Sequence, residues 1–137
     1  MFKEVRVFML FVVFTAGVAS AATFTVSNTN ATGPGSLVDA INQANASAGP
    51  HTINITASGT MTVTTPLVLT QSMTINGPLA TPPVFTIDGG NATRLIQVSA
   101  SAAGPMTLTG ITLTHGRVDS AKGGAIDVPA GRTLNLT

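Results

Sequence analysis

Apolar and polar residues alternate along most of the chain after Pro50. Units of an apolar residue, a polar residue (usually Thr or Asn) and a second apolar residue recur, for example at residues 53–55, 73–75 and 106–108. A period of two predicts strands with one buried face. Units this short are poor hairpins, but they suit the rungs of stacked coils. The pattern therefore predicts an all-β, right-handed, single-stranded parallel β-helix over residues 51–137, with repeats of about 20–25 residues.

A different pattern precedes these units. Apolar residues recur at helical spacing between residues 37 and 44, which predicts one short helix from residue 37 to about residue 46. Ser36 is a suitable N-cap, and Asp39 stands at the third helical position of a capping box. Gly49 and Pro50 are expected to end the helix, with Gly49 in a left-handed conformation.

The segment 22–50 is thus expected to form a first strand, at residues 23–26, followed by this helix. A terminal rung of a solenoid exposes both its apolar interior and unpaired backbone groups. The helix is therefore predicted to cap the open end of the first coil. The last predicted rung, residues 134–136, has no such cover, and we expect the coils to continue beyond a truncated C-terminus or to associate end to end.

Residues 1–21 have the organisation of a secretory signal peptide. Basic residues come first, an apolar run follows from residue 7, and Ala19-Ser-Ala21 supplies the small residues of a cleavage site. An uncleaved membrane anchor is the alternative, but the run is shorter than the roughly 20 residues that cross a bilayer. No other stretch is long and apolar enough to span a membrane.

Composition narrows the classes of partner. After residue 21, four basic residues balance four acids, so the formal net charge is zero. A neutral chain lacks the basic surface that binds nucleic acid or anionic lipid. The sequence has no Cys, so an exported chain must rely on its core and backbone pairing instead of disulfides.

Several segments resemble exported bacterial β-helix proteins. Gly33-Pro-Gly-Ser-Leu37 is similar to the helix start of that family, although Val38 stands where Arg is usual. Asp88-Gly89 and residues 111–116 are similar to its recurrent rungs. Gly123-Gly-Ala-Ile126 resembles the repeated motif of polymorphic outer-membrane proteins and autotransporter passengers.

The resemblance implies a structural or adhesive passenger that is secreted or displayed at the cell surface or outer membrane. Its implied partners are a surface polysaccharide or a host or cell-surface protein. The alternative is the N-terminal part of a β-helix polysaccharide lyase or glycoside hydrolase whose catalytic coils lie further along the chain. The full-length gene would separate the two readings.

One turn region gathers the most reactive side chains, namely His115, Arg117, Asp119 and Lys122. An enzyme would use Asp119 or Asp88 as acid or base, and Arg117 to hold a sugar carboxylate. However, glycosidases need two acids at a set separation, and the paired acids of such enzymes are missing here. We therefore interpret these residues as a solvated surface turn and assign no catalytic residue.

The sequence also predicts no metal or cofactor site. Asp88-Gly-Gly90 offers one carboxylate, whereas calcium takes about six to eight oxygens, so the segment is interpreted as a turn with glycine at positive φ. His51 is isolated and is expected at the surface. Five Asn-x-Ser/Thr sequons, at Asn30, Asn45, Asn54, Asn91 and Asn135, are attributed to an Asn- and Thr-rich composition.

Overall fold

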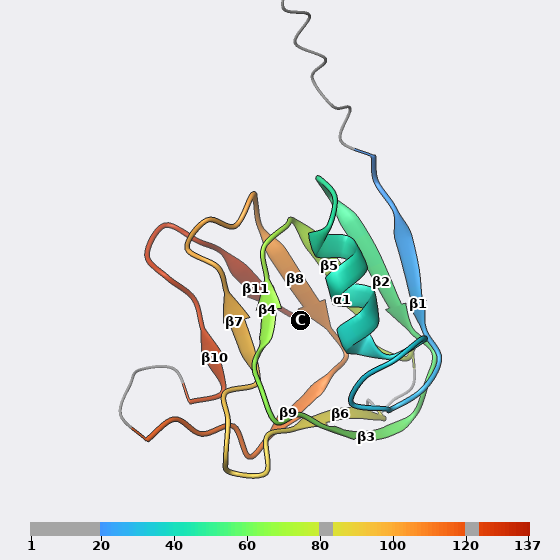
Figure 1. The fold of residues 1–137 in the computed structure, drawn as a ribbon, viewed down its shortest axis with the longest axis vertical. Coiled ribbons are helices and arrows are strands. Elements are labelled where there is room, and N and C mark those ends of the chain that lie inside the picture. Colours follow the sequence, from blue (N-terminus) through green and yellow to red (C-terminus); the bar gives the residue numbers. More distant parts are fainter. Residues whose placement is uncertain (1–19, 80–83, 120–123) are drawn as a thin grey trace, which may run out of the picture.

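The computed structural model describes residues 20–79, 84–119 and 124–137 (Figure 1). All but the last two residues of the predicted leader lie outside these ranges. The elements in chain order are β1 (Thr23–Val26), α1 (Leu37–Asn45), β2 (His51–Ile55), β3 (Gly59–Thr62), β4 (Leu67–Leu69), β5 (Met73–Asn76), β6 (Phe85–Asp88), β7 (Ile96–Val98), β8 (Met106–Thr109), β9 (Thr112–Thr114), β10 (Ile126–Asp127) and β11 (Leu134–Leu136).

The strands form three parallel sheets that surround a common core. The largest has the order β1-β2-β5-β8-β11, and the others have the orders β3-β6-β9 and β4-β7-β10. Each coil contributes one strand to each sheet, so that β2, β3 and β4 form the first coil and β5, β6 and β7 the second. Figure 1 shows β2, β5 and β8 side by side, although long segments separate them along the chain. The predicted all-β parallel solenoid with one short helix is confirmed.

The coils differ in length although their strands stay in register. His51, Met73, Met106 and Leu134 occupy equivalent positions in the five-stranded sheet. Successive equivalent residues are 22, 33 and 28 positions apart. The expected repeat of about 20–25 residues therefore holds only for the first coil. Backbone pairing fixes the strands alone, so the corners between them absorb the extra residues.

The inward side chains of the strands stack in columns along the solenoid. Ile53, Ile75 and Leu108 form one such column in the five-stranded sheet, and each is at most 4% exposed. Phe85 and Leu69, from the other two sheets, are completely buried. Burial of one such side chain contributes about 1.5–3 kcal/mol, so the columns supply much of the stability of a chain without disulfides.

The start of α1 agrees with the sequence in part. Ser36 caps the helix, because its hydroxyl oxygen accepts a hydrogen bond from the Asp39 N–H at 3.2 Å. The return bond of a capping box is replaced, since the Ser36 N–H donates to the Gly33 carbonyl. The Asp39 carboxylate instead accepts a hydrogen bond from the Gln43 side chain at 2.9 Å.

The predicted end of α1, at about residue 46, is confirmed, but the predicted left-handed cap at Gly49 is wrong. The helix ends at Asn45, and its C-cap, Ala46, is right-handed with a φ of −76°. Gly49 does not have a positive φ. A Cβ at Gly49 would collide with the Ser72 carbonyl oxygen. Glycine is needed here because two backbone segments approach closely, and not because the helix needs a left-handed cap.

α1 covers the first coil, where it packs against β1, β2 and β4. Its last residue also pairs with the edge of β4. The Asn45 amide donates to the Val68 carbonyl at 2.8 Å and accepts from the Thr70 N–H at 3.0 Å. One side chain thus replaces the neighbouring strand that this edge lacks. Across the described ranges, no helix combines the length and apolar character needed to cross a membrane.

Asn45→Ala should lower the free energy of unfolding by about 1 kcal/mol, because it removes both hydrogen bonds to the edge of β4. Urea denaturation measures the change. Asn42→Ala is the matched control. Asn42 is exposed on the same helix, and its replacement changes the helix propensity by the same amount, from that of Asn to that of Ala. Equal stabilities for the two variants would show that the edge gains nothing from Asn45.

Candidate functional site

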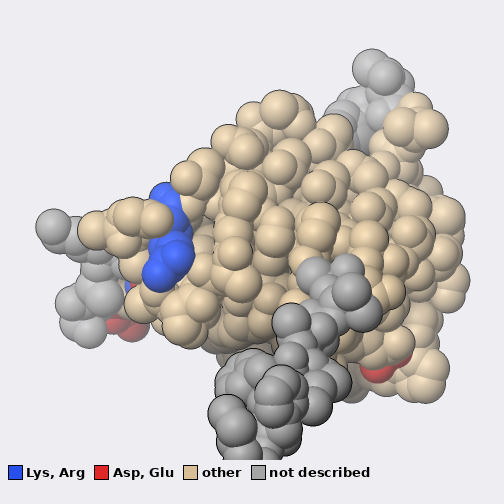
Figure 2. Space-filling view, turned by 90° about the horizontal axis from the view of Figure 1, so that it is seen from above, with Lys and Arg blue, Asp and Glu red and all other residues tan. Residues whose placement is uncertain are grey.

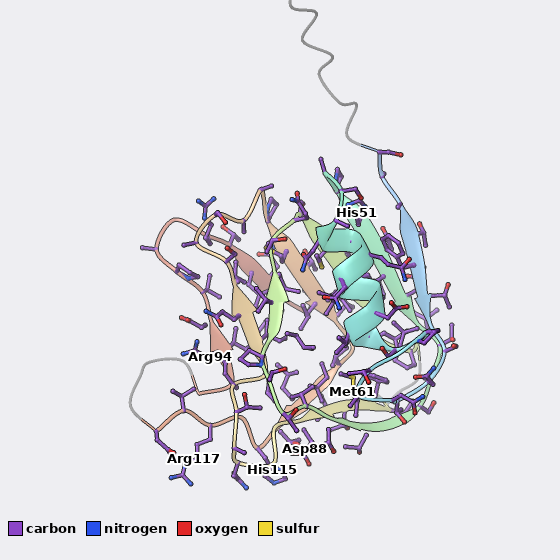
Figure 3. The ribbon with its side chains drawn as sticks, viewed as in Figure 1. His51, Met61, Asp88, Arg94, His115 and Arg117 are labelled. Atoms are coloured by element: carbon purple, nitrogen blue, oxygen red, sulfur yellow. The ribbon has the colours of Figure 1, made fainter. Side chains whose placement is uncertain are left out.

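Three pairs of polar side chains lie in this part of the solenoid, and two of them contain residues of the sequence-predicted cluster. The first pair joins the ends of two neighbouring strands, β6 and β9, which are parallel partners. His115 Nδ1 lies 3.1 Å from Asp88 Oδ1, and the Gly90 N–H donates to the same oxygen at 2.8 Å. Figure 3 shows Asp88 and His115 together at one corner of the solenoid. Gly90 has a φ of 57°, which confirms the predicted turn.

The surroundings of Asp88 favour its ionised form. The hydrogen bond from the Gly90 backbone is the main cause that lowers the pKa of Asp88 below its ordinary value of 3.8, and His115 lowers it further. Partial burial opposes this shift. A carboxyl with a lowered pKa is a poor general acid at neutral pH, since it holds no proton to donate.

The second and third pairs are ion pairs. Arg117 Nε lies 2.7 Å from Asp119 Oδ1, and both side chains are more than half exposed. Arg94 lies 2.9 Å from Asp127, and only 12% of the Arg94 side chain is exposed. Sequence reasoning missed the pair of Arg94 and Asp127, because these residues meet only when β10 pairs with β7. Lys122 lies outside the described residues.

Two of these arginines border a shallow depression of about 350 Å³, which Asp119 and Thr93 also line. The Asp119 carboxylate in this lining already pairs with Arg117. Asp88, Asp119 and Asp127 each face a different basic or imidazole group, so these three carboxylates have separate partners and do not share a proton with one another. Within the same ranges, no three His, Cys, Asp or Glu side chains are grouped as metal ligands.

A second candidate site is the outer face of the five-stranded sheet. Outward positions along each strand form two columns in which every residue is Thr or Asn. The register places Thr23, Thr52, Thr74, Thr107 and Asn135 in one column, and Thr25, Asn54, Asn76 and Thr109 in the other. We call these two columns the Thr/Asn face.

The strands of the Thr/Asn face carry no Asp, Glu, Lys or Arg. Within the second column, Asn76 donates to Asn54 at 3.0 Å, and Thr109 at the end of this column lies 2.9 Å from the hydroxyl of Thr137, which follows β11. Parallel strands repeat every 4.7–4.9 Å or so, which gives the polar groups a regular spacing. The space-filling view in Figure 2 shows another largely uncharged surface, with charged side chains only near its margins.

A groove runs beside one of these columns. It has a volume of about 700 Å³. Asn54, Asn76 and Thr109 line it from the sheet, and Pro78 and Leu79 line it from the following corner. Ligand pockets commonly have volumes of about 300–1,000 Å³ and combine apolar walls with a few polar groups. Asn54 is the middle residue of its alternating unit, and Asn76 and Thr109 directly follow theirs, so the alternation in the sequence places all three on the outer side of the sheet.

His51 is not at the surface, contrary to prediction. It is only 2% exposed, and its ring packs edge-on against Phe24 with the ring centroids 5.8 Å apart. Both ring nitrogens have partners, namely the Ala22 N–H at 3.2 Å and the Ser47 carbonyl at 3.0 Å. The prediction failed because β1, which covers His51, precedes it by a whole helix in the sequence.

Comparison with known proteins adds no relative. No family model matches the chain, and neither the curated proteins nor the solved structures include a significant match.

Asp88→Asn should reduce the dependence of stability on acid. Because the folded-state pKa of Asp88 is lowered, its ionised form stabilises the fold above about pH 4, and this contribution is lost as the pH falls through the lowered value. The melting temperatures of the parent and the variant should therefore differ at pH 7 and converge near about pH 2. Asp119→Asn, in an exposed ion pair, is the control. A difference for Asp88→Asn that stays constant across this range would contradict the assignment.

Proposed function

We propose that this protein is an exported β-solenoid passenger, secreted or displayed at the cell surface, with a structural or adhesive role. The observation that carries the proposal is the Thr/Asn face, which presents regular columns of uncharged hydrogen-bonding groups across five strands. The leader-like sequence of residues 1–21 supports export. The resemblance to autotransporter passengers and polymorphic outer-membrane proteins belongs to this proposal, as does a right-handed winding of the coils.

An uncharged face favours an uncharged partner. A charged polymer would lose part of its hydration on this surface and would gain no opposite charge in return. A neutral surface polysaccharide presents hydroxyl groups that can donate and accept, and the Thr hydroxyls and Asn amides do the same. We therefore propose a neutral polysaccharide as the partner of the adhesive surface.

The groove beside the face supports a binding role. The Asn76 amide uses one N–H to bond Asn54, which leaves its carbonyl oxygen open to a ligand. Pro78 and Leu79 supply an apolar wall opposite these polar groups. Sugars have polar edges and apolar C–H faces, so a groove with both kinds of lining matches their chemistry.

The enzyme alternative has less support within the described coils. A lyase or hydrolase of this fold would need acids free to exchange protons with substrate. Asp88, Asp119 and Asp127 are instead engaged by His115, Arg117 and Arg94.

Binding of the exported protein to immobilised neutral and acidic polysaccharides tests the adhesive role. We expect retention on a neutral glucan or mannan that changes little between low and high salt, because no ion pair contributes. Thr109→Val should weaken retention by about tenfold, which corresponds to one lost hydrogen bond. Thr86→Val, on the outer face of β6, is the matched control.

Two results would contradict the proposal. One is retention only on acidic polysaccharides with loss at high salt, which would point to the arginine-lined depression. The other is equal weakening by Thr109→Val and Thr86→Val, which would separate binding from the Thr/Asn face.

A further inference from the structure

The buried histidine at the start of β2 has a specific partner at the beginning of the folded chain. Ala22 directly precedes β1, and its N–H donates to His51 Nδ1 at 3.2 Å. The other ring nitrogen, Nε2, lies 3.0 Å from the Ser47 carbonyl and 3.4 Å from the Ser47 hydroxyl. Figure 3 shows His51 near the start of β1, beside the end of α1. The ring is thus held on both sides.

These contacts fix which nitrogen carries the proton. A backbone N–H can only donate, so Nδ1 must present its lone pair to Ala22. A carbonyl oxygen can only accept, so Nε2 must carry the hydrogen that faces Ser47. His51 is therefore a neutral imidazole whose free acceptor points at the nitrogen of Ala22.

The same residue follows the cleavage motif of the leader. Ala19-Ser-Ala21 places small residues at the two positions that a signal peptidase requires, and Ala22 comes next. Hydrolysis of the bond between Ala21 and Ala22 consumes one water, leaves a carboxylate on Ala21 and frees the amino group of Ala22. We propose that Ala22 is the mature N-terminus and that its α-amino group is bound by His51 Nδ1.

The geometry accommodates both the cut and its product. Ser20 and Ala21 are exposed and belong to no strand, so the peptide bond before Ala22 lies outside the backbone ladder. The Ala22 carbonyl accepts from the Thr52 N–H at 2.8 Å, which begins that ladder. Ala22 is only half-buried, so water can hydrate the remaining N–H groups of an ammonium.

The inferred role of this site is to fix the first residue of the solenoid. Without His51, the residues before β1 would be held by the single bond to Thr52 and would fray. A bound terminus also resists aminopeptidases, which need an extended, accessible N-terminal residue. The inference rests on the proposed export, since only a processed chain has an α-amino group at this position.

Two histidine replacements separate the two sides of the ring. The Asn side chain places its oxygen near the position of Nδ1, so His51→Asn keeps an acceptor for Ala22. The Gln side chain reaches the position of Nε2, so His51→Gln keeps the contact with Ser47 and loses the acceptor. His115→Gln, at the more exposed histidine of the Asp88 pair, is the control for the substitution itself.

The full chain is expressed with its leader in an exporting host, and the exported protein is analysed by intact mass and then by timed aminopeptidase digestion. The mass should correspond to a chain that begins at Ala22. Trimming should be about tenfold faster for His51→Gln than for the parent, the factor expected for one lost hydrogen bond. His51→Asn and His115→Gln should be trimmed at close to the parental rate. Far-UV circular dichroism verifies that each variant is folded.

Other results would overturn the inference in distinguishable ways. An exported chain that retains its leader overturns both this site and the proposed export. A chain cleaved at another bond overturns the assignment of Ala22 and leaves export intact. Cleavage at Ala22 with equal trimming of His51→Gln and His51→Asn overturns the role of Nδ1. If His51→Gln does not fold, faster trimming of Ser47→Ala than of His51→Asn overturns it instead, because Ser47 contacts only the far nitrogen.

Discussion

Parallel backbone pairing between equivalent strands of successive coils is the interaction on which the rest of this structure depends. The register carries His51 to Met73 and Met73 to Met106 without a shift, and this register alone aligns the inward columns. The sequence has no Cys to take over this task. Each coil touches only its neighbours, so the first coil needs partners from elsewhere. α1, the Asn45 amide and β1 provide them.

The sequence predicted the rungs well, because period-two alternation reports directly which side chains face the core. Residues 53–55, 73–75 and 106–108 each fall within a strand. The lengths of the coils were not predictable, since corners are governed by local turn chemistry that has no period. Gly49 illustrates the same limit. The sequence predicts that this glycine caps the helix. Glycine is needed there because the backbone of Ser72 lies too close for a side chain, and this contact arises only from the stacking of coils.

The candidate sites also differ in how far the sequence predicts them. The Thr/Asn face can be read from the sequence once the rungs are recognised, because its residues are the outward members of those rungs. Asp88 and His115 are 27 residues apart, and their contact depends on the three corners that separate β6 from β9. His51 is followed by alternating residues that suggest only a strand start, whereas its burial comes from Phe24, which belongs to β1. A contact with a residue one coil away produces no recognisable pattern in the neighbouring sequence.

The unequal corners show where residues can be inserted into this solenoid. A coil of 33 residues stacks between coils of 22 and 28 residues without disturbing the strand register. Residues can therefore be added at a corner while the pairing of the strands stays unchanged. The stacked strands thus set the spacing along the solenoid, and the corners determine which residues are displayed at each coil.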